Sequence, residues 1–200
     1  YRIALAQSKL GQPEIKLGSI PGGTGTQSLP RVVGVEKACD MMLSGKPITA
    51  DQGLAYGLVD LVVEDDLVQH ACDFVQQVLD SGKPLVVPMQ RGFPIMPSPD
   101  YFANQRAHIK SISYGFQAPL DALACIQMAC EESIETALAD ESRRFMALMT
   151  GPASHAMRYQ FMAEHLARQV PNVHKDTPTT TISSVGIVGG GLMGCGIAIV

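Results

Sequence analysis

Residues 11–31 read GQPEIKLGSIPGGTGTQSLPR, and the rest of the chain is organised around this stretch. It holds one carboxylate, Glu14, among apolar side chains on a turn that a proline opens. Three glycines follow within residues 22–25, where the backbone can approach another backbone or a ligand closely. Burial among apolar neighbours disfavours the charged form of a carboxyl group, so Glu14 could hold a proton and deliver it as a general acid. Taken alone, the residues favour a solvated turn glutamate.

This stretch belongs to a longer likeness. Residues 13–34, PEIKLGSIPGGTGTQSLPRVVG, resemble the signature of the crotonase superfamily, the enoyl-CoA hydratases and isomerases. The likeness continues through residues 43–63, LSGKPITADQGLAYGLVDLVV, and covers roughly residues 1–80. Thr24 stands where many relatives carry glycine, and Ser28 stands where many carry arginine. These two departures do not affect the reaction class that the resemblance implies, but they leave the assignment to a subfamily open.

The resemblance implies that Glu14 serves the α-carbon proton, both in the hydration of a 2-enoyl thioester and in the shift of a double bond from position 3 to position 2. It also implies contacts with an acyl-CoA substrate at Pro13, Ile20, Pro21 and Gly22. Pro13 would set the direction of the Glu14 side chain, whereas Ile20 and Pro21 could line the acyl channel or be core residues. The family's other glutamate and its oxyanion-hole amides lie upstream of this sequence, so we expect the chain alone to be inactive.

A second motif lies near the end of the sequence. Residues 189–194 read GGGLMG, a G-x-G-x-x-G pattern between an expected strand, Ile182–Val188, and an expected apolar helix, Gly194–Val200. In this context the pattern is typical of a turn that binds a dinucleotide pyrophosphate. The cofactor-binding residues expected here are Gly189, Gly191, Leu192, Met193 and Gly194.

These residues would have different roles. Gly189 would make the tight turn, Gly191 would let the backbone reach the pyrophosphate, and Gly194 would allow close packing of helix on strand. The amides that follow Gly191 would face the phosphates at the positive end of the helix. Residues 185–200 resemble the start of the 3-hydroxyacyl-CoA dehydrogenases, which implies NAD as the cofactor. The acidic residue that separates NAD from NADP is expected about 20 positions on, beyond Val200.

Both likenesses in one chain, in this order, resemble the multifunctional enzymes of fatty-acid β-oxidation, of the peroxisomal bifunctional type and its bacterial relatives. The resemblance implies an enoyl-CoA hydratase and isomerase joined to an NAD-dependent 3-hydroxyacyl-CoA dehydrogenase, acting on acyl-CoA thioesters. Two alternatives stay open: another acyl-CoA reaction of the crotonase fold, or a non-catalytic acyl-CoA-binding or scaffold segment. A bacterial cytoplasm or, alternatively, a peroxisome is the expected location, and a thiolase subunit is a possible partner.

The predicted fold class is α/β. It combines the C-terminal part of a crotonase ββα-spiral and a helical extension with the first strand, turn and helix of a Rossmann domain. The expected domains are the hydratase/isomerase part, a Pro-rich loop with linker helices, a polar linker and the start of the NAD-binding domain, over residues 1–87, 88–170, 171–181 and 182–200.

Local patterns predict the individual elements. Apolar runs indicate strands within residues 1–10 and 58–63. Helical spacing of apolar residues predicts helices over residues 32–43, between 65 and 82, over 101–116, over 119–149 and from 152 to about 170. Thr49 and Gln52 form a capping box that opens a further short helix.

Composition excludes several classes of function. A net charge of −4 gives no basic field for nucleic acid. The five cysteines and five histidines show no spacing typical of a metal site, and the cysteines are expected to be reduced and mostly buried. No apolar run approaches the roughly 18 residues of a membrane span.

Overall fold

The structure, a computed structural model, describes residues 1–82, 84–85, 87–169, 173–174 and 176–199. These residues form two units, Tyr1–Ala163 and Glu164–Val200. Some sequence predictions lie outside the described residues. They concern residue 170 as the end of a helix, residues 171, 172 and 175 in the polar linker, and residue 200 in the last helix. The domain boundaries expected from the sequence stay predictions.

Two small sheets belong to the first unit. β1 (Ile3–Leu5) pairs in parallel with β4 (Leu61–Val63), and β2 (Lys9–Leu10) pairs antiparallel with β3 (Ile48–Thr49). Ala4 of the parallel pair is buried against the segment that follows β3. The strands expected from both apolar runs are therefore confirmed, although each is shorter than its run.

Helices make up most of the described chain. The α-helices are α1 (Gly25–Val33), α2 (Val35–Ser44), α3 (Ala50–Ala55), α4 (Leu67–Asp80), α5 (Tyr101–Ile112), α6 (Ala118–Glu131), α7 (Ile134–Met149), α8 (Pro152–Ala167) and α9 (Leu192–Ile199). Two short 3-10 helices are η1 (Glu14–Leu17) and η2 (Pro88–Gln90).

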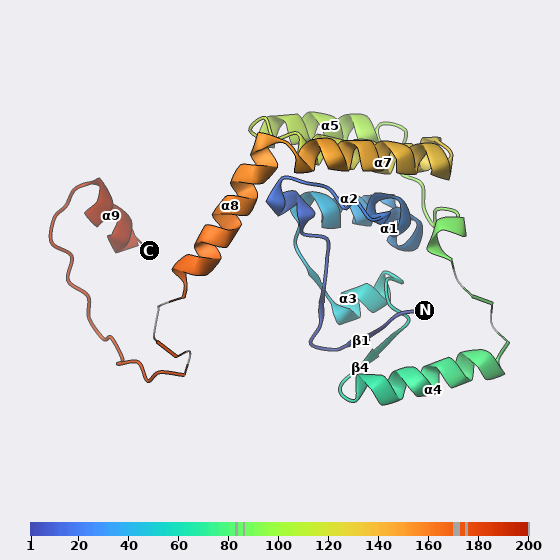
Figure 1. Cartoon of the computed structure of the whole chain (residues 1–200), viewed down its shortest axis with the longest axis horizontal. Coiled ribbons are helices and arrows are strands. Elements are labelled where there is room, and N and C mark those ends of the chain that lie inside the picture. The colour runs from blue at the N-terminus through green and yellow to red at the C-terminus, as the bar shows by residue number, and fades with distance from the viewer. Residues whose placement is uncertain (83, 86, 170–172, 175, 200) are drawn as a thin grey trace. The chain divides into compact units, whose positions relative to one another are not determined.

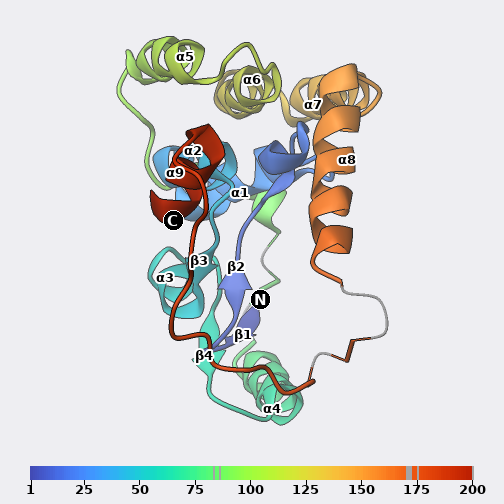
Figure 2. The same cartoon turned by 90° about the vertical axis from the view of Figure 1, so that its left-hand side faces the viewer.

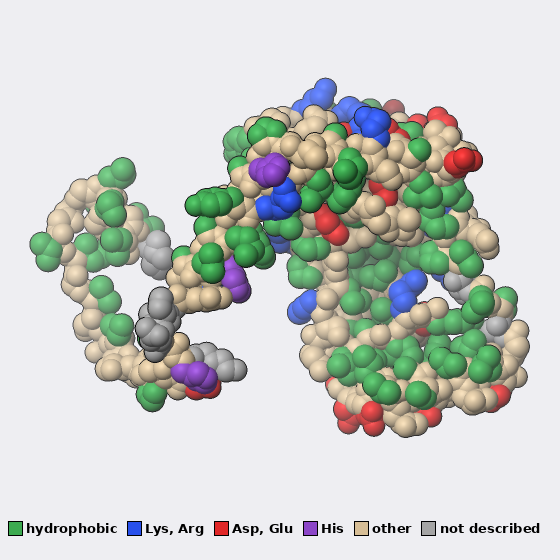
Figure 3. Space-filling view, in the orientation of Figure 1, with side chains coloured by type: hydrophobic (Ala, Val, Ile, Leu, Met, Phe, Trp, Pro, Cys, Tyr) green, Lys and Arg blue, Asp and Glu red, His purple; other side chains and the backbone are tan. Residues whose placement is uncertain are grey.

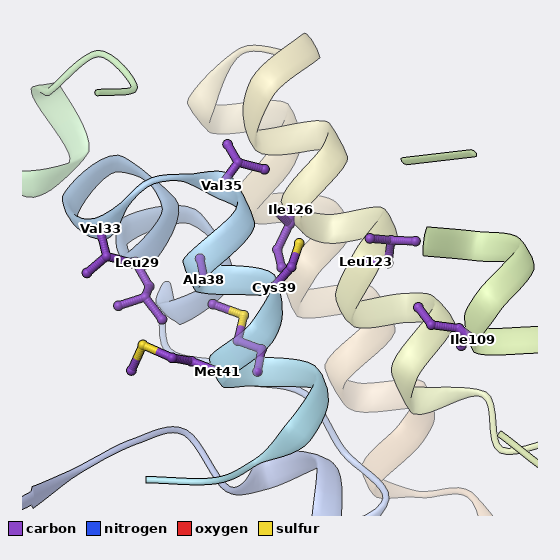
Figure 4. Close-up of a cluster of buried hydrophobic side chains, with 10 residues drawn as sticks. Leu29, Val33, Val35, Ala38, Cys39, Met41, Ile109, Leu123 and Ile126 are labelled. Carbon is purple, nitrogen blue, oxygen red and sulfur yellow. The ribbon is translucent and has the colours of Figure 1, made fainter. Parts of the chain in front are cut away.

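The first unit has a layered arrangement. Helices α5, α6 and α7 form one layer over α1 and α2, whereas α3, α4 and the paired strands lie at the opposite end (Figure 1, Figure 2). The main core fills the space between α1, α2, α5 and α6 (Figure 4). Its buried residues are Leu29, Val33, Val35, Ala38, Cys39, Met41, Met42, Ile109, Leu123 and Ile126.

The capping box predicted at the start of α3 is confirmed. The Thr49 hydroxyl accepts the backbone N–H of Gln52 at 3.2 Å, and the Gln52 side chain accepts the backbone N–H of Thr49 at 2.9 Å. Each side chain satisfies a donor that the first helical turn leaves without a partner. The helix expected after Asp65 is also present as α4, with Asp66 as its N-cap.

Helix α1 was not predicted, because the helix expected in this region began only at residue 32, after the glycines and Pro30. The structure has two helices, α1 and α2, in place of the single one expected over residues 32–43, and Gly34 separates them with φ of 92°. A positive φ of this size is costly for residues with a side chain, so glycine suits the break. Pro30 lacks an N–H for the helix ladder, and α1 persists because α6 and α7 contact it.

The single helix predicted over residues 119–149 is wrong. It divides into α6 and α7, because Glu132 has an extended backbone and Ser133 starts a new helix. The Ser133 hydroxyl accepts the backbone N–H of Thr136 at 3.2 Å, which is the usual N-cap hydrogen bond. The apolar spacing continues across this break and gives no sign of it.

The predicted strand over Ile182–Val188 is not formed in the described structure, where residues 182–190 have neither helix nor strand. A strand is defined by its hydrogen-bonded neighbours, and none of the described residues pairs with this stretch. The helix expected from Gly194 is present as α9 but begins two residues earlier, at Leu192.

Helix α4 leaves apolar side chains in contact with solvent. Val68, Val75 and Leu79 are 74%, 55% and 67% exposed, and no residue of the helix is fully buried. Figure 3 shows hydrophobic side chains gathered over this end of the first unit. The segment therefore folds as a helix, but its apolar face is only partly covered by the described residues.

The cysteines are free thiols, but only part of the prediction that they are mostly buried is right. Cys39 and Cys125 are buried and Cys130 is half-buried, whereas Cys72 and Cys195 are exposed. Burial raises the pKa of Cys39 and of Cys125 to about 12, and that of Cys130 to about 11. These three thiols are thus held in the unreactive protonated form at neutral pH.

An ion-pair network joins α6 to α7. The Arg144 guanidinium binds Asp121 of α6 and Asp140 of its own helix, and Arg143 also binds Asp140. Burial acts to raise the pKa of Asp140, but hydrogen bonds from Arg144 and Arg143 outweigh it, so this pKa is lowered. The stability that these bonds contribute is present above the pKa of an unfolded aspartate, about 3.9, and is lost as the pH falls through the lower folded value.

We expect Asp140→Asn to lower the free energy of unfolding by about 0.5–1 kcal/mol at neutral pH, because it removes the charge shared by the two arginines. The difference from the unchanged protein should shrink as the pH falls below about 4. Denaturant unfolding at a series of pH values measures it. Glu64→Gln, at an exposed position, is the control and should change stability little at any pH. A loss for Asp140→Asn that does not depend on pH would contradict this account.

Candidate functional site

The segment around Glu14 is a single 3-10 turn. Glu14 is its first residue, and the N–H of Lys16 donates to the carbonyl of Pro13 at 2.9 Å. Gly18 ends the turn with φ of 67°, a left-handed conformation that glycine adopts without steric cost. The N–H of Ser19 then returns to the Glu14 carbonyl at 3.1 Å. The backbone of Glu14 is thus fixed from both sides.

The Glu14 side chain is half-buried and incompletely satisfied. Its Oε2 is buried and has no hydrogen-bond partner among the described residues, and the same is true of Oε1 of Gln12. A buried acceptor without a donor costs about 1–3 kcal/mol, so its presence in a folded protein requires an explanation. A carboxyl group in this state can exchange a proton with a bound ligand.

Gly22 and Gly25, in the turn that follows the Glu14 segment, let side chains pack closely against the backbone. A Cβ atom at Gly22 would lie 2.3 Å from the ring of Phe145, and one at Gly25 would lie 2.6 Å from Nε2 of Gln12 and from Cβ of Pro21. Real Cβ atoms do not come this close, so only glycine fits these positions. The side chains of Gln12 and Pro21 therefore meet at Gly25. Gln12 lies two residues before Glu14 in the sequence.

The four residues expected to contact substrate have different surroundings. Pro13 is exposed, Gly22 is half-buried, and Pro21 is buried against Gly25. Ile20 is 0% exposed and packs in a cluster around Ala122 and Cys125 of α6. This favours the core role that the sequence left open for Ile20. Substrate contacts at all four positions stay predictions.

The helical extension also holds the Glu14 turn. The Ser154 hydroxyl of α8 donates to the carbonyl of Leu17 at 2.9 Å, and a Cβ at Gly18 would lie 3.0 Å from Sδ of Met157. The Glu141 carboxylate of α7 accepts the backbone N–H of Thr24 at 2.8 Å. Sequence reasoning missed Ser154 and Glu141, since each contacts residues more than a hundred positions away.

Gln12 was missed as well. A polar residue between Gly11 and Pro13, two positions before the carboxylate, is a weak signal that could have drawn attention to it. Its buried, unpartnered oxygen makes it a candidate for contact with a ligand.

The glycine-rich turn of the second unit has the close approach that its motif requires. Gly189 has φ of 110°, and a Cβ at Gly194 would lie 1.9 Å from the Gly189 carbonyl oxygen. Only glycine fits at this point of α9. Leu192 and Met193, at the start of the helix, are 94% and 79% exposed. The turn and the helix N-terminus fit a pyrophosphate, whereas the preceding strand is not formed.

Two further predictions concern metal sites and membrane-spanning helices. Among the described residues, no group of three or more His, Cys, Asp or Glu side chains could hold a metal ion. In the same part of the chain, no helix has the length and apolar character needed to cross a membrane.

Comparison with known proteins begins with a family. The model of the enoyl-CoA hydratase/isomerase family matches residues 1–109. The match contains Glu14, the glycines at positions 22, 23 and 25, helices α1 to α4 and most of α5.

Two relatives match almost the whole chain. The peroxisomal bifunctional enzyme of Homo sapiens is 35% identical over 206 residues, which covers 100% of this chain and 28% of the relative. The fatty acid oxidation complex subunit alpha of Shewanella amazonensis is 32% identical over 200 residues, covering 96% of this chain and 28% of the relative. The chain thus spans 28% of the length of the curated relatives it matches.

A solved structure has a similar fold. The enoyl-CoA hydratase/isomerase of Pseudoalteromonas atlantica superposes with a TM-score of 0.51 at 20% identity, covering 81% of this chain and 52% of that chain. The likeness confirms the predicted crotonase fold for the part of the chain that it covers.

The contact between Gly22 and Phe145 can be tested with a matched pair of variants. Gly22→Ala should lower the free energy of unfolding by about 1–3 kcal/mol, because the new methyl group overlaps the Phe145 ring. Gly23→Ala is the control, since no atom lies within 4 Å of a Cβ there. Its effect should stay within about 0.5 kcal/mol. Equal losses in the two variants, measured by denaturant unfolding, would rule out this contact.

Proposed function

Because the chain belongs to the enoyl-CoA hydratase/isomerase family, we propose that it carries part of an active site for enoyl-CoA thioesters, with Glu14 as the group that exchanges the α-carbon proton. The observation that supports this role is the buried Oε2 of Glu14, which has no hydrogen-bond partner among the described residues. A substrate bound beside it would provide the atom with which it exchanges a proton.

In hydration, water adds across the double bond of a 2-enoyl thioester. The water oxygen bonds to the β-carbon while water gives up one proton to the second glutamate, which would come from upstream sequence, and protonated Glu14 delivers its proton to the α-carbon, leaving a carboxylate. In the isomerase reaction the Glu14 carboxylate removes an α-carbon proton, the double bond moves from position 3 to position 2, and the proton returns to the γ-carbon. One carboxyl group that can be either protonated or ionised suffices for the proton transfers to and from the substrate carbons.

The other parts of this site are assigned from the family. Pro13, Pro21 and Gly22 would contact the substrate beside Glu14, and Ile20 would support them from the core. The second glutamate and the oxyanion-hole amides would come from upstream sequence. An oxyanion donor is worth about two to three powers of ten in rate, so we expect negligible hydratase activity from this chain alone.

We propose further that the second unit begins an NAD-binding dehydrogenase domain. The residues that would hold the pyrophosphate are Gly189, Gly191, Leu192, Met193 and Gly194. When bound there, NAD would supply the hydride acceptor for oxidation of a 3-hydroxyacyl-CoA, the hydroxyl proton passing to a base from sequence beyond residue 200. The backbone at Gly191 would approach the phosphates, and the close contact of Gly194 with the Gly189 carbonyl would keep the helix N-terminus at the turn.

These two activities would act in sequence in fatty-acid β-oxidation, because the product of hydration is the substrate of the dehydrogenase. The complete protein would then be a bifunctional enzyme like the relatives named above. We propose a bacterial cytoplasm as its location, with a peroxisome as the alternative, and a thiolase subunit as a possible partner.

The role of Glu14 is tested in the full-length reading frame that contains this chain. Glu14→Gln removes the transferable proton, so we expect the kcat of enoyl-CoA hydration to fall about 10²- to 10⁴-fold, with a similar loss of double-bond shift. Reduction of NAD with a 3-hydroxyacyl-CoA should be unchanged.

Glu36→Gln, at an exposed position on α2, is the control for that substitution and should retain all three activities. Hydration that survives Glu14→Gln would make Glu14 a turn residue, and the crotonase assignment would then describe only the fold.

The cofactor turn is tested by a second pair of variants. Gly194→Ala forces the turn open, since its Cβ would overlap the Gly189 carbonyl oxygen, and we expect the Kd for NAD to rise at least about tenfold. Gly190→Ala should leave the Kd within about twofold, because no atom lies within 4 Å of a Cβ there. Calorimetric titration with NAD measures both. Hydration should be the same in the two variants, and an equal loss of NAD binding would exclude a special role for Gly194.

A further inference from the structure

Glu141 is a buried acidic residue for which the proposed reaction has no use. It lies in the middle of α7 and is 1% exposed. Its Oε1 accepts the backbone N–H of Thr24 at 2.8 Å, and its Oε2 accepts the backbone N–H of Thr26 at 3.1 Å. The Thr26 hydroxyl also donates to Oε2. A side chain of α7 thus satisfies three donors at the start of α1.

These donors need an acceptor from outside their own helix. The first turn of a helix leaves backbone N–H groups without partners, and they are usually capped by the side chain of the N-cap residue. Thr24 holds that position in α1, but its φ is 69° and its side chain makes no capping hydrogen bond. The Glu141 carboxylate takes over this task, and its negative charge suits the positive end of the α1 dipole.

The capped turn contacts the residue two positions before Glu14. Gly25 lies between the two threonines that Glu141 binds, and the Gln12 amide packs directly on it. Gln12 stands two residues before Glu14, and both side chains carry a buried oxygen without a partner among the described residues. A shift of the backbone at Gly25 would therefore move the surface on which the Gln12 side chain, close in sequence to Glu14, is placed.

The rest of α1 is attached elsewhere. Nε2 of Gln27 donates to the Cys125 carbonyl and Nη2 of Arg31 donates to the Ala129 carbonyl, each at 3.0 Å, which ties the helix to α6. Arg31 also lies over the Phe93 ring at 4.7 Å. Loss of the Glu141 contact would thus release the N-terminal turn of α1 while leaving its remaining length in place.

We propose that Glu141 is a positioning residue for the Glu14 site, holding the Thr24–Thr26 turn so that Gln12 and Glu14 keep their places at the substrate. This rests on the proposed function of Glu14. Glu141 is buried and both its oxygens are bonded to Thr24 and Thr26, so it would act on the rate through geometry. A catalytic group displaced by about 1 Å can lose about 10²-fold in rate.

The first experiment is Glu141→Gln in the full-length reading frame. The amide keeps the size of the side chain but turns one acceptor into a donor that faces a backbone N–H. We expect the kcat of hydration to fall about 10- to 100-fold, with KM within about twofold, because the loss arises mainly in the transition state. Dehydrogenase activity should be unchanged. Hydrogen exchange at the amides of Thr24 and Thr26 should accelerate, whereas amides in α6 should keep their protection.

Two controls separate this effect from general damage. Glu135→Gln changes an exposed glutamate of the same helix and should leave kcat and amide exchange unaltered. Thr26→Val removes the hydroxyl that donates to Glu141 and that accepts Nε2 of Gln27 at 3.0 Å, and it should lower kcat severalfold, while Thr26→Ser keeps this hydroxyl and should restore kcat. The Thr26 pair decides the matter if Glu141→Gln fails to fold, since both variants leave the carboxylate and the backbone donors in place.

The outcomes distinguish the two proposals. If Glu14→Gln leaves hydration intact, the proposed function fails. If Glu14→Gln abolishes hydration but Glu141→Gln, with faster exchange at Thr24 and Thr26, retains full kcat, the function stands and the positioning role is overturned. Equal kcat values for Thr26→Val and Thr26→Ser would overturn it as well.

Discussion

The hydrogen bonds between the Glu141 carboxylate and the first turn of α1 are the constraint on which the rest of the first unit depends. A buried carboxylate costs several kcal/mol unless donors surround it, and buried N–H groups without an acceptor are costly too. Each partner therefore requires the other. Thr24, the residue before α1, has a left-handed backbone and makes no capping hydrogen bond, so the start of α1 depends on α7 packed beside it.

The helical extension and the Glu14 segment consequently form one packed structure. Phe145 occupies the space above Gly22, and Ser154 binds the end of the Glu14 turn. The main core likewise contains residues from both sides of the boundary expected at residue 87, since Leu29 and Met42 pack with Ile126 of the extension. A change in amino-acid composition, such as the Pro-rich stretch, therefore does not imply that the segments on its two sides form separate cores.

Local chemistry made part of this structure predictable. The capping box at Thr49 involves neighbours in sequence and was predicted, as was the helix that begins after Asp65. The family signature around Glu14 then gave the crotonase fold. The break at Ser133 was missed because apolar spacing runs across it, and α1 was missed because Pro30 is normally a helix breaker.

The remaining features depend on distant parts of the chain. The stretch Ile182–Val188 has strand-like composition, but a strand needs a hydrogen-bonded neighbour, which composition cannot provide. Glu141 looked like one more acidic residue on a helix. Its acceptor role is decided by backbone amides that lie 115 and 117 positions earlier, and no pattern within α7 indicates them.

That separation has a consequence for synthesis on the ribosome. The turn at Thr26 leaves the ribosome well before Glu141 has been translated, because 115 further residues must be added. At the usual rate of about 5–20 residues per second, the delay is roughly 6–23 s. During this time the amide groups at the start of α1 can donate only to water, because the Glu141 carboxylate is not yet present. Nascent chains should therefore pass through a period in which this region is open to chaperones and proteases, and it closes only when α7 emerges.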